Sequence, residues 1–159
     1  ADILYLVTPY TNRLGRVHVT RGKKLTAPDT PREPVYTPGK DIRGFTVTTY
    51  NFWAGVCEDA VIDSDIPVDE NGYYTIVVSS NEDRPRNATK ENGVTWLDWG
   101  TYLDGQLTFR LLVRRAEKLV QLKAAIETGE VEKEIAPYVP KSKHCSVQAF
   151  EEKGWKAAF

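Results

Sequence analysis

Apolar and polar residues alternate with a period of two along most of the first two-thirds of the chain. Within residues 16–21, Val17 and Val19 share one face and polar side chains share the other. Residues 106–113 alternate in the same way, with Leu107 and Phe109 on the apolar face. This period is typical of a β-strand that buries one face. Together with β-branched and aromatic runs, it predicts strands over residues 3–7, 16–21, 44–53, 61–62, 73–79, 94–97 and 106–113.

Turn signals separate the predicted strands. Residues 69–72 (Asp-Glu-Asn-Gly) and the pair Asn92–Gly93 each precede a strand. Asp104 and Gly105 form a two-residue signal for a tight β-hairpin between the segments on either side. Residues 22–40 are rich in proline, which removes hydrogen bonds from ladders and helices. We therefore expect this segment to form an ordered loop that lies across the surface as a strap.

The apolar period changes to a helical one after Arg114. Apolar residues recur at helical spacing until Ile126, and Gly129 follows as a C-terminal stop. Residues 130–136 predict a second short helix that ends before Pro137. Ser146 is an N-cap residue for a further helix over residues 147–153.

Strands followed by helices indicate a mostly-β protein. Turn signals at short, regular spacing favour an antiparallel β-sandwich, jelly-roll-like, with two or three C-terminal helices. A length of 159 residues fits a single domain over residues 1–159. Within it, we expect residues 115–159 to form a helical extension that packs on the sheets.

Composition limits the cellular compartment and the kinds of binding partner that we expect for this protein. Lys and Arg number 21 against 22 Asp and Glu, which argues against a broad nucleic-acid-binding surface. No apolar run approaches the ~20 residues that cross a bilayer. The chain begins with Ala1 and contains no Met, so we expect a processed exported protein or a fragment of a longer precursor.

The chain has two cysteines, Cys57 and Cys145, and their wide spacing fits neither a zinc ribbon nor a redox pair. In a processed, exported chain this count predicts one disulfide between them. Closing so long a loop would contribute about 4–5 kcal/mol in the chain-entropy model. The alternative is two independent buried thiols.

No residue pattern identifies a catalytic or cofactor site. The only histidines, His18 and His144, show no local pairing, and two histidines exclude a three-histidine metal site. No nucleophile elbow or phosphate-binding loop occurs. We therefore assign no catalytic residue, no cofactor and no transition-metal site. Calcium is the one metal alternative, and its candidate ligands are Asp63, Asp65 and Asp69.

Aromatic residues supply the candidate binding site. The cluster from Trp96 to Tyr102 includes Trp99, which follows the predicted strand at a position we expect to be exposed. With Trp53, these side chains suit stacking on sugar rings or anchoring a protein interface; packing in the core is the alternative. Separately, Asn87 begins an Asn-Ala-Thr glycosylation pattern in a polar loop.

Several segments together resemble a known group of proteins. They are residues 15–23, 68–79, 83–85, 87–89 and 92–97, Trp99-Gly100, His144-Cys145, Phe150 and Gly154-Trp155. In these segments the chain resembles a family of uncharacterised exported bacterial proteins, distantly akin to bacterial β-sandwich domains of unknown function. The resemblance implies export and a β-sandwich module, often the C-terminal part of a longer polypeptide. It implies no activity, so no catalytic residue is carried over.

Taken together, these features predict a secreted, extracellular or periplasmic β-sandwich without catalytic function. We expect it to bind a protein partner or assemble with itself at the cell envelope or outside the cell, with residues 26–40 of the proline-rich strap as one docking segment. The alternative is a carbohydrate-binding or hydrolytic domain that uses the Trp96–Tyr102 region. We expect no nucleic-acid partner.

Overall fold

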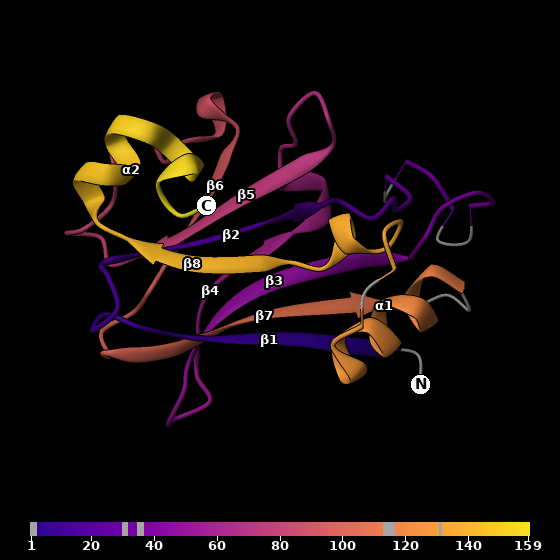
Figure 1. Cartoon of the computed structure of the whole chain (residues 1–159), viewed down its shortest axis with the longest axis horizontal. Helices are drawn as coiled ribbons and strands as arrows, with labels where there is room; N and C mark the ends of the chain where they lie inside the picture. Colours follow the sequence, from indigo (N-terminus) through magenta and orange to yellow (C-terminus); the bar gives the residue numbers. More distant parts are fainter. Residues whose placement is uncertain (1–2, 30–31, 35–36, 113–116, 131) are drawn as a thin grey trace.

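Two four-stranded sheets form the body of the protein. The computed structural model describes residues 3–29, 32–34, 37–112, 117–130 and 132–159. The first sheet has the order β1 (Ile3–Thr11), β7 (Asp104–Leu112), β3 (Gly44–Asn51), β4 (Cys57–Ile62). The second has the order β6 (Val94–Asp98), β5 (Tyr73–Ser79), β2 (Val17–Lys23), β8 (Lys141–Cys145) (Figure 1).

The second sheet is mixed, which corrects the prediction of antiparallel pairing throughout. β5 and β6 run parallel, with Thr75 opposite Val94 and Ser79 opposite Asp98. The intervening segment, which includes the short 3₁₀ helix η2 (Lys90–Asn92), carries the chain back to the starting end of β5. Parallel neighbours require such a long connection, whereas a tight turn would have made the pair antiparallel.

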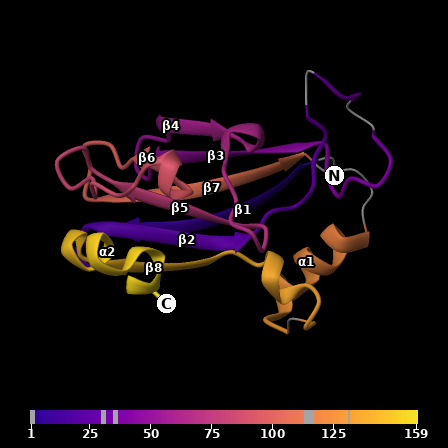
Figure 2. The same ribbon diagram turned by 90° about the horizontal axis from the view of Figure 1, so that it is seen from above.

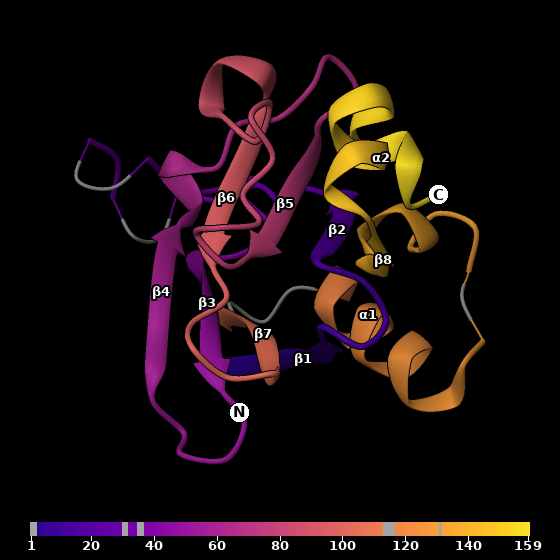
Figure 3. The ribbon, with the colours of Figure 1, turned by 90° about the vertical axis from the view of Figure 1, so that its left-hand side faces the viewer.

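The main apolar core lies between the two sheets. Its buried side chains include Phe45, Val47, Leu107, Phe109 and Leu111 from the first sheet and Tyr74, Ile76, Val78 and Leu97 from the second. They alternate with outward-facing residues, as the sequence pattern predicts for strands with one face on the core. Seen from the side, β4 and β6 lie next to each other at one border of the sheets, and α1 (Glu117–Thr128) lies by β1 and β8 at the other (Figure 3).

A second apolar cluster covers the outer face of the second sheet. It joins Val17, Val19, Val77 and Val94 to Phe150 of α2 (Val147–Lys153) and Ala158 beyond the 3₁₀ helix η4 (Gly154–Ala157). Figure 2 shows α2 beyond β2, on the side away from β3 and β7. The strands of this sheet are therefore covered on both faces.

The N-cap predicted for α2 is confirmed. The Ser146 side chain accepts a hydrogen bond from the backbone N–H of Ala149 at 3.1 Å, and Gly154 follows the helix with a φ of 60°. This bond satisfies one of the N–H groups that a helix leaves without a partner in its first turn.

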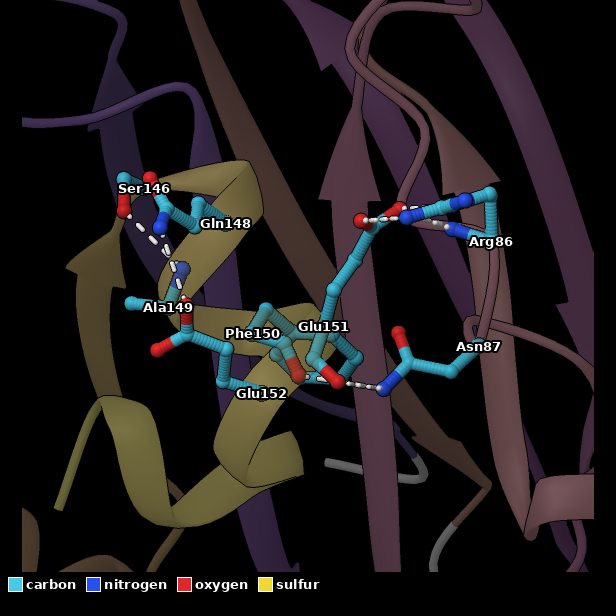
Figure 4. Close-up of polar contacts among 8 residues, drawn as sticks. All are labelled: Arg86, Asn87, Ser146, Gln148, Ala149, Phe150, Glu151 and Glu152. Carbon is cyan, nitrogen blue, oxygen red and sulfur yellow. Dashed lines mark hydrogen bonds and ion pairs between the residues drawn. The ribbon is translucent and has the colours of Figure 1, made fainter.

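The loop after β5 forms an ion pair and hydrogen bonds with α2 (Figure 4). Arg86 donates from Nε and Nη2 to the two carboxylate oxygens of Glu151, at 3.0 and 2.8 Å. This hydrogen-bonded pair lowers the pKa of Glu151 to about 2. Asn87 Nδ2 donates to the backbone oxygens of Phe150 and Glu151, at 3.0 and 3.3 Å. Glycosylation of Asn87 stays a prediction, and it would remove one of the two hydrogens that this nitrogen donates.

The C-terminal part differs from the predicted helical extension. α1 confirms the first helix, but residues 133–135 form a turn that leads into the 3₁₀ helix η3 (Ala136–Tyr138), so the described part of the segment 130–136 is not the α-helix predicted there. The extension also supplies β8, which pairs with β2. Its sequence, Lys-Ser-Lys-His-Cys, has no apolar alternation, because this edge strand exposes Lys141 and Lys143 to solvent.

The hairpin predicted at Asp104–Gly105 is also wrong. Both residues begin β7, and β6 and β7 belong to different sheets. Gly105 lies opposite Tyr10 of β1, and the Tyr10 ring occupies the space that a Cβ on Gly105 would fill. Glycine is thus needed here for the close approach of an aromatic ring, a role that looks like a turn signal in the sequence.

We expect Gly105→Ala to destabilise the fold by about 1–3 kcal/mol, because the new methyl group forces Tyr10 out of its position. Chemical denaturation measures the loss. A double-mutant cycle with Tyr10→Ala isolates the cause, since Gly105→Ala should cost little once the ring is gone. Equal costs in both backgrounds would contradict this explanation.

Candidate functional site

The loops at one end of the strands surround a polar pocket of about 490 Å³. We call it the loop-end pocket; its lining residues are Asn12, Arg16, Glu58, Ser80–Asp83 and Asp98–Leu103. The connections that follow β1, β5 and β6 meet at this end, together with the start of β4. A backbone hydrogen bond of 3.0 Å from Asn12 to Leu103 joins two of these loops. Residues far apart in the sequence therefore converge here.

Two carboxylates lie close together in this pocket, and hydrogen bonds hold that of Asp98 in position. Asp98 accepts from the Asn81 side-chain amide at 2.7 Å and from the backbone N–H of Gly100 at 2.9 Å. Glu58 lies directly against Gly100, whose φ of 81° and missing Cβ allow this approach. Burial, followed by the charges of Glu58 and Asp98, raises the pKa of Tyr10 behind them. Both carboxylates are thus close enough to Tyr10 for their negative charges to raise the pKa of the same phenol.

The lining of the loop-end pocket is predominantly acidic. Its carboxylates belong to Glu58, Glu82, Asp83 and Asp98, whereas Arg16 is the one basic residue that lines it. Arg16 is paired with Asp83 at 3.4 Å. No hydrogen bond or ion pair engages the Glu58 carboxylate within the described part of the chain. The pocket therefore offers an acceptor to a ligand and repels anions.

Tyr102 and Trp99 both line this pocket, but they have different roles. The Tyr102 side chain is 53% exposed, so its ring is free to contact a ligand. Trp99, which we expected to be exposed, is only 5% exposed. Its ring packs on Tyr10 with centroids 4.3 Å apart, and its Nε1 donates to the backbone oxygen of Tyr102 at 3.0 Å. Trp99 thus supports the loop that presents Tyr102.

The other two predicted aromatic residues lie elsewhere. Trp96 is half-buried beside a groove of about 560 Å³ between β4 and β6, with the Arg84 guanidinium 4.3 Å from its ring centroid. Trp53 is 75% exposed in the β3–β4 hairpin, where it packs edge-to-face on Phe52. The predicted group of four therefore does not form one site, and Tyr102 and Trp99 alone lie together.

The structure brings together the two histidines, which the sequence did not pair. β2 and β8 are neighbours, with His18 opposite His144. His18 Nδ1 lies 3.4 Å from His144 Nε2, and the Thr20 hydroxyl lies 3.2 Å from His18 Nε2. Because the backbone N–H of Thr11 donates to His144 Nε2, that nitrogen is an acceptor and His18 carries its proton on Nδ1.

Burial keeps this histidine pair neutral. His18 is 1% exposed; burial, and then the proximity of His144, lowers its pKa to about 3. Burial also lowers the pKa of His144. The Tyr10 ring contacts His18 and Trp99, and Trp99 contacts His144, so an aromatic and polar cluster forms the interior wall behind the loop-end pocket.

The predicted disulfide is wrong, because both cysteines are free. Cys57 is exposed at the start of β4, an edge strand of the first sheet. Cys145 is buried at the end of β8, an edge strand of the second sheet. β4 and β8 lie at opposite borders of the two-sheet body, which separates the sulfurs (Figure 3).

The calcium candidates are not gathered into a site. Asp69 pairs with Arg21, while Asp63 lies near Lys24, whose Nζ donates to the Asp63 backbone oxygen at 2.6 Å. Asp65 lies among the lining residues of the groove between β4 and β6. Within the described residues, no three His, Cys, Asp or Glu side chains are grouped so as to hold a metal ion. The calcium alternative therefore finds no support.

Comparison with known proteins gives one distant structural likeness. No protein-family model matches the chain, and no curated protein matches it significantly. The crystal structure of an uncharacterised protein from Burkholderia cenocepacia is similar with a TM-score of 0.49 and 16% sequence identity. The match covers 70% of this chain and 26% of that one, so the chain spans about a quarter of that protein's length. No helix in the described ranges is long and apolar enough to cross a membrane.

Proposed function

We propose that this chain is a binding module that takes a neutral carbohydrate in the loop-end pocket. The observation that carries the proposal is the combination of the exposed Tyr102 ring with the carboxylates of Glu58 and Asp98 in one pocket. An aromatic ring packs on the apolar face of a sugar, while carboxylate and amide groups accept and donate hydrogen bonds to its hydroxyls.

The charge of the pocket narrows the ligand class. Four lining carboxylates, from Glu58, Glu82, Asp83 and Asp98, disfavour uronates, sulfated sugars and phosphates. Neutral saccharides carry hydroxyl donors that suit these acceptors. The same proposal includes export from the cell and a jelly-roll-like sandwich fold. The two four-stranded sheets support the sandwich fold.

We expect the isolated chain to bind at least one neutral oligosaccharide on a glycan array, and Tyr102→Ala to weaken that binding at least about tenfold. Glu58→Gln should also weaken it, because an amide is a poorer acceptor than a carboxylate. Trp53→Ala is the matched control, since it removes an exposed aromatic ring outside the pocket.

Two outcomes would contradict the proposal. One is the absence of binding to any neutral glycan by the unmodified chain. The other is an equal loss of binding in Tyr102→Ala and Trp53→Ala, which would indicate non-specific aromatic contacts.

A second candidate function, docking of a protein partner or self-assembly, is favoured by a separate observation. Exposed apolar side chains are concentrated on the loops at the same end: Leu14, Phe52, Trp53, Val56 and Leu103. Such patches often mark interaction surfaces. Light scattering on the unmodified chain and on Trp53→Ser tests self-assembly. If both proteins are monomers, and a pull-down with the unmodified chain captures no partner, the docking function is contradicted.

A further inference from the structure

A second pocket, of about 380 Å³, lies on the second sheet, where β2, β5 and β8 meet η3 and η4. Its aromatic walls come from Tyr73, Trp155 and Phe159. Arg21 and Lys141 supply its charged side chains, and no Asp or Glu side chain lines it within the described part of the chain. Its character is therefore opposite to that of the acidic loop-end pocket.

Arg21 is held rigidly in this pocket. Its Nη1 donates to the Thr75 hydroxyl at 2.9 Å, and its Nη2 pairs with Asp69. The guanidinium carbon lies 4.0 Å from the Trp155 ring centroid and 5.1 Å from that of Tyr73. A cation this close to two aromatic rings is attracted to both of them.

Lysines add positive charge around the rim. Lys141 lines the pocket and its side chain is exposed. Lys143 Nζ lies 5.9 Å from the Phe159 ring centroid, and Lys156 Nζ lies 5.9 Å from that of Trp155. Asp69, the acidic group that contacts Arg21, neutralises one of these charges, so the pocket and its rim remain positive.

We propose that this pocket binds a small organic anion with a flat, apolar body, such as an aromatic carboxylate. Aromatic walls bury the apolar faces of such a ligand, and the lysine ammonium groups attract its anionic group. The site is separate from the loop-end pocket, so the two proposals stand independently.

Two probes that differ in charge test the proposal: 2-naphthoate and 2-naphthylmethylammonium. Titrations followed by ¹H–¹⁵N NMR report on the Trp155 indole N–H and on the backbone of β2 and β8. We expect naphthoate to shift these signals and to bind at least about tenfold more tightly than the ammonium probe. Added salt should weaken naphthoate binding, because the attraction is electrostatic.

Lys141→Gln should weaken naphthoate binding by about fivefold or more. The side chain is exposed at an edge strand, so the variant should fold normally. Lys90→Gln is the matched control, because Lys90 is exposed beside the groove between β4 and β6. Equal affinity for the two probes, shifts confined to other surfaces, or equal losses in the two variants would each overturn the proposal.

Discussion

Phe150→Ala should destabilise the folded chain by about 3–5 kcal/mol, the range for removing a fully buried aromatic ring. The Phe150 side chain is 0% exposed and packs with Val17, Val19 and Val77 of the second sheet. It is the one side chain of α2 that is fully buried. Removing the ring leaves a cavity beneath a short helix that has little stability of its own.

Chemical denaturation followed by tryptophan fluorescence measures this loss. Phe159→Ala is the matched control, because this phenylalanine is 40% exposed and its truncation should cost far less. Phe150→Leu should recover part of the stability, since it refills much of the cavity. A cost below about 1 kcal/mol for Phe150→Ala would show that α2 contributes little to folding.

Acidification should destabilise the protein strongly between pH 6.5 and pH 4. His18 has an ordinary pKa of 6.5, and burial lowers it to about 3 in the folded chain. Between these values the unfolded chain binds a proton that the folded chain excludes, so stability falls as the pH falls. The stabilisation is fully present above pH 6.5. Because His18 of the unfolded chain binds one proton over this range, the free energy of unfolding should drop by ~3 kcal/mol between pH 7 and pH 4.

His18→Gln isolates this contribution. The groups that face His18 are His144, Thr20 and the Tyr10 ring, and none of them carries a negative charge that would stabilise an imidazolium. Glutamine keeps a polar group near Thr20 without titrating. Plots of the unfolding free energy against pH should therefore be flatter for the variant below pH 6.5. Parallel plots for the two proteins would contradict the assignment.

Local patterns predicted most of the strands and helices. Alternation in residues 16–21 identified β2 because Val17 and Val19 pack together on its outer face, under α2. The β-branched run in residues 73–79 identified β5, which is buried along nearly its whole length. Ser146 predicted the start of α2, because an N-cap depends on a neighbouring backbone N–H alone. β8 was missed because its polar edge sequence carries no apolar period, although it completes the second sheet.

The candidate site was predictable in part. The cluster around Trp99 and Tyr102 was found because aromatic residues are visible in any sequence. The partners Glu58, Asn81 and Arg16 come from other loops, and nothing local shows that β4 and β6 lie side by side. The His18–His144 contact depends in the same way on the pairing of β2 with β8.

The strand order has a consequence for how the chain is made. β1 pairs with β7, and β2 pairs first with β5 and then with β8, so both early strands are completed by strands from much later in the chain. Such distant pairings slow folding, because long loops must close first. During translation, the outer apolar face of β2, with Val17 and Val19, remains uncovered until Phe150 of α2 has been synthesised. We therefore expect nascent chains that stop before this point to depend on chaperones and to aggregate without them.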